Sequence, residues 1–233
     1  MSMQELLPNY LKRPEVRPVL LFLLAAALGI AFAKILSELL EGDLADVDRA
    51  ILQLFRAPGN PSEPLGPFWL QAMARDITSL GGLAILSLVT IVSLGYLALT
   101  RLWSFAVMVM VSGFGGTAIS SAVKLLIQRA RPDFSPEVVH LHDYSFPSGH
   151  SFLSAVTYLT LGILLARIQP RLEMKIYLLS IAMGITILVG LSRLYLGVHW
   201  PTDVLAGWCA GAAWAILCWS AAEWLHLKRP MGG

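Results

Sequence analysis

Six long apolar runs separated by short polar segments dominate this sequence. The runs cover approximately residues 18–37, 80–99, 103–121, 150–166, 176–191 and 204–225. A helix needs about 20 apolar residues to cross the roughly 30 Å of a bilayer's hydrocarbon core. Of all residues, 56% are hydrophobic and only 14% are charged, which is more apolar surface than one water-soluble core can bury. The pattern therefore predicts an all-α, polytopic membrane protein with six transmembrane helices.

The first two runs are separated by an acidic, turn-rich segment, residues 38–79. Within it, apolar residues recur at helical spacing between Leu44 and Phe55, which predicts an amphipathic helix lying on the membrane. Residues 68–73 suggest a second interfacial element. We expect Asp76 and Thr78, near the end of this segment, to line the entrance of a site on the same side.

The first run also permits another interpretation, a cleaved signal peptide. Ala31-Phe32-Ala33 resembles a cleavage site behind an apolar core. However, the apolar stretch continues through Ile35 and Leu36, so we expect the first span to remain in the protein. Neither an internal repeat nor a low-complexity tract divides the chain, which predicts a single domain over residues 1–233.

Six spans place both chain termini on one side of the membrane. That side carries nine basic and four acidic residues, a balance of +5, whereas the other side carries the remaining eight basic and eleven acidic residues, a balance of −3. Cytoplasmic loops carry an excess of Lys and Arg. We therefore expect both termini in the cytoplasm and residues 144–150 on the extracytoplasmic side.

Three polar segments fall on this predicted outer side, and the first is residues 124–132, Lys-Leu-Leu-Ile-Gln-Arg-Ala-Arg-Pro. Lys124 and Arg131 are two helical turns apart, so we expect them to project from one face of a helix that Pro132 limits. The two cations would then converge. Alternatively, they anchor a helix end to lipid headgroups.

The second segment, Pro147-Ser148-Gly149-His150, is a turn that leads into the fourth apolar run. A helix start offers backbone N–H groups and a positive dipole end, and both favour an anion. Alternatively, Ser148 is only an N-capping serine and His150 is incidental.

The third segment runs from Ser192 to Asp203. Pro201 suits the first position of a helix, which puts Asp203 in the first turn, within reach of His199. A carboxylate on one imidazole nitrogen fixes the tautomer and makes the other nitrogen a better nucleophile.

Together, the three segments supply the groups that phosphoryl transfer needs. Lys124, Arg131 and Arg193 can neutralise a phosphate dianion, and the Ser148 hydroxyl can donate to its oxygens together with the amides of the next two residues. One histidine can attack phosphorus while the other protonates the leaving oxygen.

The pattern Lys-x6-Arg-Pro, Pro-Ser-Gly-His, Ser-Arg-x5-His-x3-Asp over residues 124–203 resembles, without a gap, the three-part signature of the type 2 phosphatidic acid phosphatase superfamily, the lipid phosphate phosphatases. The resemblance implies an all-helical core, a phosphohistidine intermediate, and no catalytic metal or other cofactor. It makes His199 the nucleophile, His150 the general acid and Asp203 the orienting partner. The phosphate-binding residues would be Lys124, Arg131, Ser148, Gly149 and Arg193.

Small size and short loops give the chain a further resemblance to bacterial members that act on undecaprenyl diphosphate, phosphatidylglycerol phosphate or phosphatidate. Among these substrates we rank the isoprenoid diphosphate first, and we expect the reaction at the outer face of the cytoplasmic membrane. Two alternatives remain open: a lipid phosphotransferase that uses the same intermediate, and an anion-binding transporter or lipid-binding scaffold. The net charge of +2 and the scattered basic residues argue against nucleic acid as a partner, and no obligate protein partner is evident.

Several other polar or small residues receive structural interpretations. His140, His142 and Asp143 lack a further ligand at metal-site spacing, so we expect no metal there. Cys209 and Cys218 are nine positions apart in one apolar run, on opposite helix faces, and are expected to be buried without a disulfide. Close helix packing is the expected role of Gly113, Gly115, Gly116, Gly207 and Gly211.

Overall fold

The computed structural model describes residues 16–134 and 144–227, and most of them are helical. The helices are α1 (Val16–Glu41), α2 (Ala45–Gln53), α3 (Phe68–Ser79), α4 (Leu83–Leu99), α5 (Trp103–Ile127), α6 (Gly149–Ile168), α7 (Leu172–Tyr195) and α8 (Pro201–Leu227). A short antiparallel hairpin, β1 (Arg56–Ala57) and β2 (Asn60–Pro64), lies between α2 and α3, where the sequence had predicted only turns. The prediction of an all-α membrane protein is confirmed.

Five helices are individually long and apolar enough to cross a membrane: α1, α5, α6, α7 and α8. The predicted span 80–99 corresponds to α4, which has 17 residues and is long and apolar enough for a span only together with α3, across a bend of 42°. The bend lies at Gly81-Gly82, where Gly82 has an extended backbone and begins α4. Helix α5 extends to Ile127, six residues beyond the predicted end of the third span.

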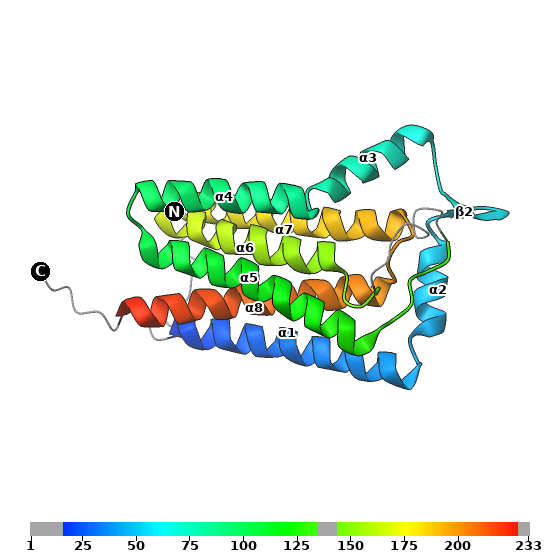
Figure 1. Cartoon of the computed structure of the whole chain (residues 1–233), viewed down its shortest axis with the longest axis horizontal. Coiled ribbons are helices and arrows are strands. Elements are labelled where there is room, and N and C mark those ends of the chain that lie inside the picture. Colours follow the sequence, from blue (N-terminus) through cyan, green and yellow to red (C-terminus); the bar gives the residue numbers. More distant parts are fainter. Residues whose placement is uncertain (1–15, 135–143, 228–233) are drawn as a thin grey trace, which may run out of the picture.

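The long helices form one bundle in which α6 packs against α5, α7 and α8, while α1 packs along α8 (Figure 1). The polar elements α2, α3 and the hairpin gather at one end of the bundle, and the first and last described residues lie at the opposite end. The last turn of α5, the first turn of α6 and the connection from α7 to α8 lie toward the same end as α2. All three motif segments therefore meet at this end.

Two glycines of α8 allow it to approach the first turns of α6. A Cβ at Gly207 would lie 2.9 Å from the Ser148 carbonyl oxygen, and one at Gly211 would lie 2.5 Å from the Phe152 carbonyl oxygen. A Cβ added at Gly115 would lie 2.5 Å from the ring of Trp214, so this glycine gives the ring its space. These contacts confirm that Gly115, Gly207 and Gly211 permit close helix packing. The same interpretation is wrong for Gly113, because an added Cβ there would meet nothing within 4 Å.

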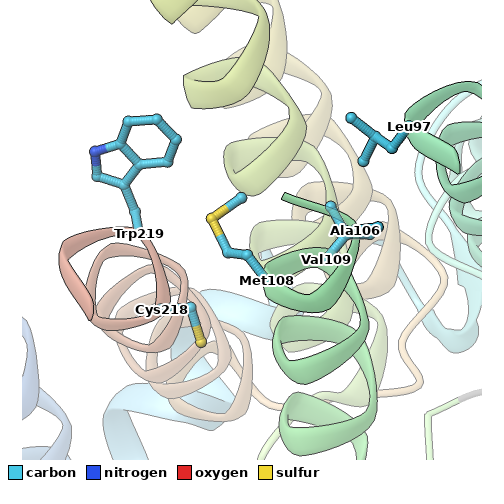
Figure 2. Close-up of a cluster of buried hydrophobic side chains, with 6 residues drawn as sticks. All are labelled: Leu97, Ala106, Met108, Val109, Cys218 and Trp219. Atoms are coloured by element: carbon cyan, nitrogen blue, oxygen red, sulfur yellow. The ribbon is translucent and has the colours of Figure 1, made fainter. Parts of the chain in front are cut away.

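A hydrophobic cluster joins α4, α5 and α8 (Figure 2). Cys218 is buried in this cluster beside Trp219, and both cysteines are free, as expected, whereas Cys209 is only partly buried instead of buried. An apolar cavity of about 870 Å³ lies between α5 and α8, lined by residues from Trp103 to Val111 and from Trp214 to Leu225. It contains no candidate site residue, so the functional site is elsewhere. The six clustered residues are Leu97, Ala106, Met108, Val109, Cys218 and Trp219.

Candidate active site

The first motif segment does not form the predicted continuous helix from Lys124 to Arg131. Helix α5 ends at Ile127 because Gln128 adopts a left-handed conformation with φ of 50°, and the chain turns before it reaches Pro132. Lys124 remains in the last helical turn and its Nζ donates to the Tyr144 carbonyl oxygen at 2.5 Å. Arg131 instead reaches the site from the segment that follows α5.

Arg131 lies directly against His199. Its Nη1 donates to the Val198 carbonyl oxygen at 2.8 Å and is 3.1 Å from His199 Nε2. The end of α5 thus brings its two predicted cations to one site, although not from one helix face.

The second motif segment forms the N-terminus of α6, as predicted. Ser148 is its N-cap, with an extended backbone, and its buried Oγ accepts from the Ser151 amide at 3.5 Å and from Ser151 Oγ at 3.1 Å. The capping bond is therefore long. Because Ser148 Oγ acts as the acceptor in both contacts, its own proton is available for another acceptor.

Gly149 and His150 form the first turn of α6, where backbone N–H groups have no acceptor within the helix. The break between α3 and α4 packs over this turn. A Cβ at Gly81 would lie 3.3 Å from His150 Cβ and 2.4 Å from Val189 Cγ1, so only glycine permits this approach. The bend in the α3–α4 span consequently helps to place His150.

The third motif segment brings His199 to Asp203 at the start of α8, which begins at Pro201 as expected. His199 is 1% exposed and Asp203 is fully buried. His199 Nδ1 is 3.5 Å from Asp203 Oδ2 and 3.3 Å from Ser145 Oγ, and the Ser145 hydroxyl donates to the same carboxylate oxygen at 2.5 Å. The Trp200 amide donates to that oxygen as well, at 2.9 Å.

Burial lowers the pKa of His199 well below its ordinary value of 6.5, and the positive charges of Arg193, Arg131, Lys124 and His150 lower it further. His199 is therefore neutral at neutral pH, which is the form that can act as a nucleophile. The same electrostatic contributions show that residues from all three motif segments lie near one imidazole.

Arg193 completes the group of cations near His199. It is 8% exposed, and its Nη1 donates to Thr78 Oγ1 on α3 at 3.1 Å. Thr78, which we expected at the entrance, therefore contacts a predicted phosphate-binding residue, whereas Asp76 is exposed. The predicted bystanders His140, His142 and Asp143 lie outside the described residues.

Behind Asp203 lies a polar network that sequence reasoning missed. Arg129 Nη1 donates to Asp203 Oδ1 at 2.7 Å, and Arg129 Nη2 donates to Asp48 Oδ2 at 2.6 Å. Asp48 comes from α2, some 80 residues earlier, and looks like any other acid of that segment. Its role, like that of Ser145, depends on tertiary contacts that no local pattern indicates.

Comparison with known proteins identifies the family. A model of the PAP2 superfamily matches residues 101–226, more than half of the chain and all three motif segments. The chain belongs to the PAP2 superfamily. Its apolar helices and this membership support an integral inner-membrane protein. Asp48 and Thr78 lie outside the residues matched by the PAP2 model.

Two curated relatives are similar over different lengths. Phosphatidylglycerophosphatase B of Bacillus subtilis (strain 168) is 38% identical over 145 residues, 61% of this chain and 70% of that protein. An undecaprenyl-diphosphatase of Sulfolobus acidocaldarius is 43% identical over 70 residues, 30% of each chain.

Among solved structures, the crystal structure of a transmembrane PAP2-type phosphatidylglycerolphosphate phosphatase from Bacillus subtilis matches with a TM-score of 0.75 and 30% identity. The match covers 89% of this chain and 98% of that one. The structural match thus covers a larger part of the chain than the residues that the family model matches.

Proposed function

We propose that this PAP2 protein is an integral membrane lipid phosphatase that hydrolyses a lipid phosphate through a phosphohistidine intermediate. The observation that carries the proposal is the environment of His199: a buried neutral imidazole with a carboxylate behind Nδ1 and cations around it. Such an imidazole is poised to attack an anionic phosphorus centre. The names of the relatives support the same class of reaction.

In the first step, the substrate phosphate binds among Lys124, Arg131 and Arg193, with the Ser148 hydroxyl and the first amides of α6 donating to its oxygens. Arg131 moves its hydrogen bond from His199 Nε2 to a phosphate oxygen. Nε2 then attacks phosphorus, the bond to the leaving oxygen breaks, and His150 gives that oxygen a proton.

In the second step, His150, now neutral, takes a proton from a water molecule that attacks the phosphorus of the phosphohistidine. The P–N bond breaks, inorganic phosphate leaves, and His199 returns to its neutral form. Asp203 holds Nδ1–H throughout and stabilises the positive charge on the phosphorylated ring. Both steps conserve protons, with His150 acting first as acid and then as base.

Several finer features belong to this proposal. The whole chain acts as one domain, both termini are cytoplasmic, and the site faces the extracytoplasmic side. Phosphatidylglycerol phosphate is the first substrate to test, because the relative with that name covers more of the chain than the undecaprenyl-diphosphatase does. Undecaprenyl diphosphate and phosphatidate complete the panel.

The test is phosphate release from these three lipids by the purified protein with a chelator present. The native protein is compared with His199→Ala and with His226→Ala, a histidine substitution near the other end of α8. We expect release from at least one lipid by the native protein and by His226→Ala, and none by His199→Ala. Strict dependence on an acceptor lipid would indicate a phosphotransferase. Anion-binding function that survives in His199→Ala would favour a transporter or scaffold.

A further inference from the structure

Two buried carboxylates share one guanidinium on the side of His199 away from the phosphate-binding cations. Asp48 and Asp203 are both fully buried, and Arg129, whose side chain is 14% exposed, bridges them. Removing one member of a buried ionic group leaves an uncompensated charge, so such a group acts as a unit. Arg129 also lies over the ring of Trp200, 5.4 Å from its centroid, which fixes the plane of the guanidinium.

Asp48 also caps the helix that carries Asp203. Its Oδ1 accepts from the Thr202 amide at 2.9 Å, and its Oδ2 accepts from Thr202 Oγ1 at 2.6 Å. A carboxylate at this position stabilises the positive end of the α8 dipole. Helix α2 therefore contributes to the N-terminus of α8 a cap that the α8 sequence itself does not supply.

The charge balance of this group bears on the reaction. Two carboxylates and one guanidinium leave one net negative charge beside His199. During phosphoryl transfer the imidazole ring becomes positive, and a negative group behind it stabilises that charge. If Asp48 were neutral, Arg129 would balance Asp203 completely and the stabilisation would weaken.

We propose that Arg129 and Asp48 are positioning residues for phosphoryl transfer, which act through Asp203 on His199. Arg129 fixes the rotation of the Asp203 carboxylate so that its second oxygen faces Nδ1, and Asp48 holds Arg129 and keeps the net charge of the group negative. The inference rests on the proposed function of His199 as nucleophile. It makes α2, which lies outside the residues matched by the family model, part of the site.

The first experiment neutralises Asp48 with an isosteric amide, Asp48→Asn, and compares it with Asp46→Asn, an exposed acid on the same helix. We expect Asp48→Asn to reduce the single-turnover rate of His199 phosphorylation about tenfold, which corresponds to the loss of one charge interaction across the network. KM should change by less than about twofold, because no substrate contact is removed. Asp46→Asn should behave as the native protein.

A second readout does not depend on activity. NMR of histidine-labelled protein should show a lower pKa for His199 in Asp48→Asn than in the native protein, since a negative charge has been removed. It should show no change in Asp46→Asn. Both variants keep the other charged and titratable groups that face His199. These groups are Lys124, Arg129, Arg131, His150, Arg193 and Asp203.

The third readout is chemical rescue of Arg129→Ala. We expect kcat of this variant to be about 100-fold lower, which is the loss typical of a small misplacement of a reacting group. Added guanidinium ion should restore at least part of the lost kcat. Asp203→Ala, which lacks the anion that guanidinium would bind, should not be rescued. Thermal unfolding of each variant shows that the protein is folded.

The proposal is overturned if Asp48→Asn and Asp46→Asn have the same phosphorylation rate and the same His199 pKa. It is also overturned if folded Arg129→Ala keeps native kcat or gains nothing from guanidinium. If the native protein releases phosphate from no lipid, the proposed function fails, and the His199 pKa in Asp48→Asn then decides on its own whether the network acts on the imidazole.

Discussion

Arg131 holds a guanidinium nitrogen 3.1 Å from Nε2 of His199, the nitrogen that would attack phosphorus. This contact places a permanent cation at the lone pair of a neutral imidazole nitrogen. A phosphate dianion offers the guanidinium a stronger partner, so binding of the substrate would free the nucleophile. In the proposed mechanism, the contact would couple substrate recognition to activation of His199.

Arg131→Lys should therefore impair binding and chemistry together. Lysine keeps the charge but loses the planar fork that can hold a phosphate oxygen and the Val198 carbonyl at once. We expect KM to rise about tenfold and kcat to fall about tenfold. Steady-state kinetics on the preferred lipid measures both. A control, Arg49→Lys on the exposed face of α2, should leave both unchanged, and native kinetics in Arg131→Lys would contradict this role.

Ser145 is expected to orient the catalytic imidazole together with Asp203. Its hydroxyl donates to Asp203 Oδ2, and its Oγ lies 3.3 Å from His199 Nδ1. Ser145→Ala therefore removes one of the two groups that hold this nitrogen. We expect kcat to fall about tenfold, equivalent to roughly 1.4 kcal/mol of transition-state stabilisation, with KM unchanged. The control is Ser154→Ala, which changes a buried serine whose Oγ donates to the Ser151 carbonyl oxygen at 3.2 Å. Equal rates for the two variants would exclude an orienting role.

Stability should depend on pH through His199. Its native pKa lies well below 6.5 because burial and neighbouring cations disfavour the charged form. Below about pH 6.5 the unfolded chain binds a proton at this residue and the native protein does not, so native stability falls as the pH drops. The free energy of unfolding falls by at most about 1.4 kcal/mol per pH unit until the native pKa of His199 is reached.

Thermal unfolding in phosphate-free detergent solution, between about pH 7.5 and 5, measures this dependence. The stability contributed by a neutral His199 is fully present above its unfolded pKa and is lost below it. His199→Gln should therefore show a shallower decline than the native protein over the acidic part of the range. Parallel curves for the two proteins would show that His199 titrates normally in the fold.

Arg56 should anchor the outer hairpin to the end of α7. The side chain is 5% exposed, and its Nη2 donates to the carbonyl oxygens of Leu194 and Tyr195, the last carbonyls of that helix. Burial lowers the pKa of the guanidinium. A Cβ added at Gly197, where φ is 71°, would lie 3.0 Å from Arg56 Nη1, so the glycine leaves room for the side chain. We expect Arg56→Ala to lower the free energy of unfolding by about 2 kcal/mol, because two buried carbonyls lose a charged donor. Arg49→Ala should have no such effect, and equal stability of the two variants would contradict the anchor.

The apolar periodicity of the chain predicted most of the fold because a transmembrane helix is determined by local composition. Residues 103–121 and 204–225 could hardly adopt another structure in a bilayer. The helix end at Ile127 was missed because the left-handed turn at Gln128 has no glycine or asparagine to signal it. Arg131 nevertheless reaches the predicted site, from the segment that follows α5.

The motif spacing predicted which residues meet at the site but not what holds them. Asp203 lies in the first turn of α8 and His199 is four positions earlier, just before the helix, so their proximity follows from local geometry. Ser145 donates to Asp203 from the segment before α6, and Asp48 of α2 is joined to Asp203 through Arg129. Both arrangements depend on tertiary packing, and a single sequence carries no local signal of that packing.

The central claim is that His199 is the nucleophile, and trapping its phosphorylated form tests it most directly. The native protein is mixed with a lipid phosphate, quenched during turnover under alkaline conditions that preserve phosphoramidate bonds, and mapped by mass spectrometry and ³¹P NMR. We predict one phosphoryl group on His199, absent in His199→Ala and still formed by His226→Ala. A phosphoryl group on another residue, or continued turnover by His199→Ala, would contradict the mechanism.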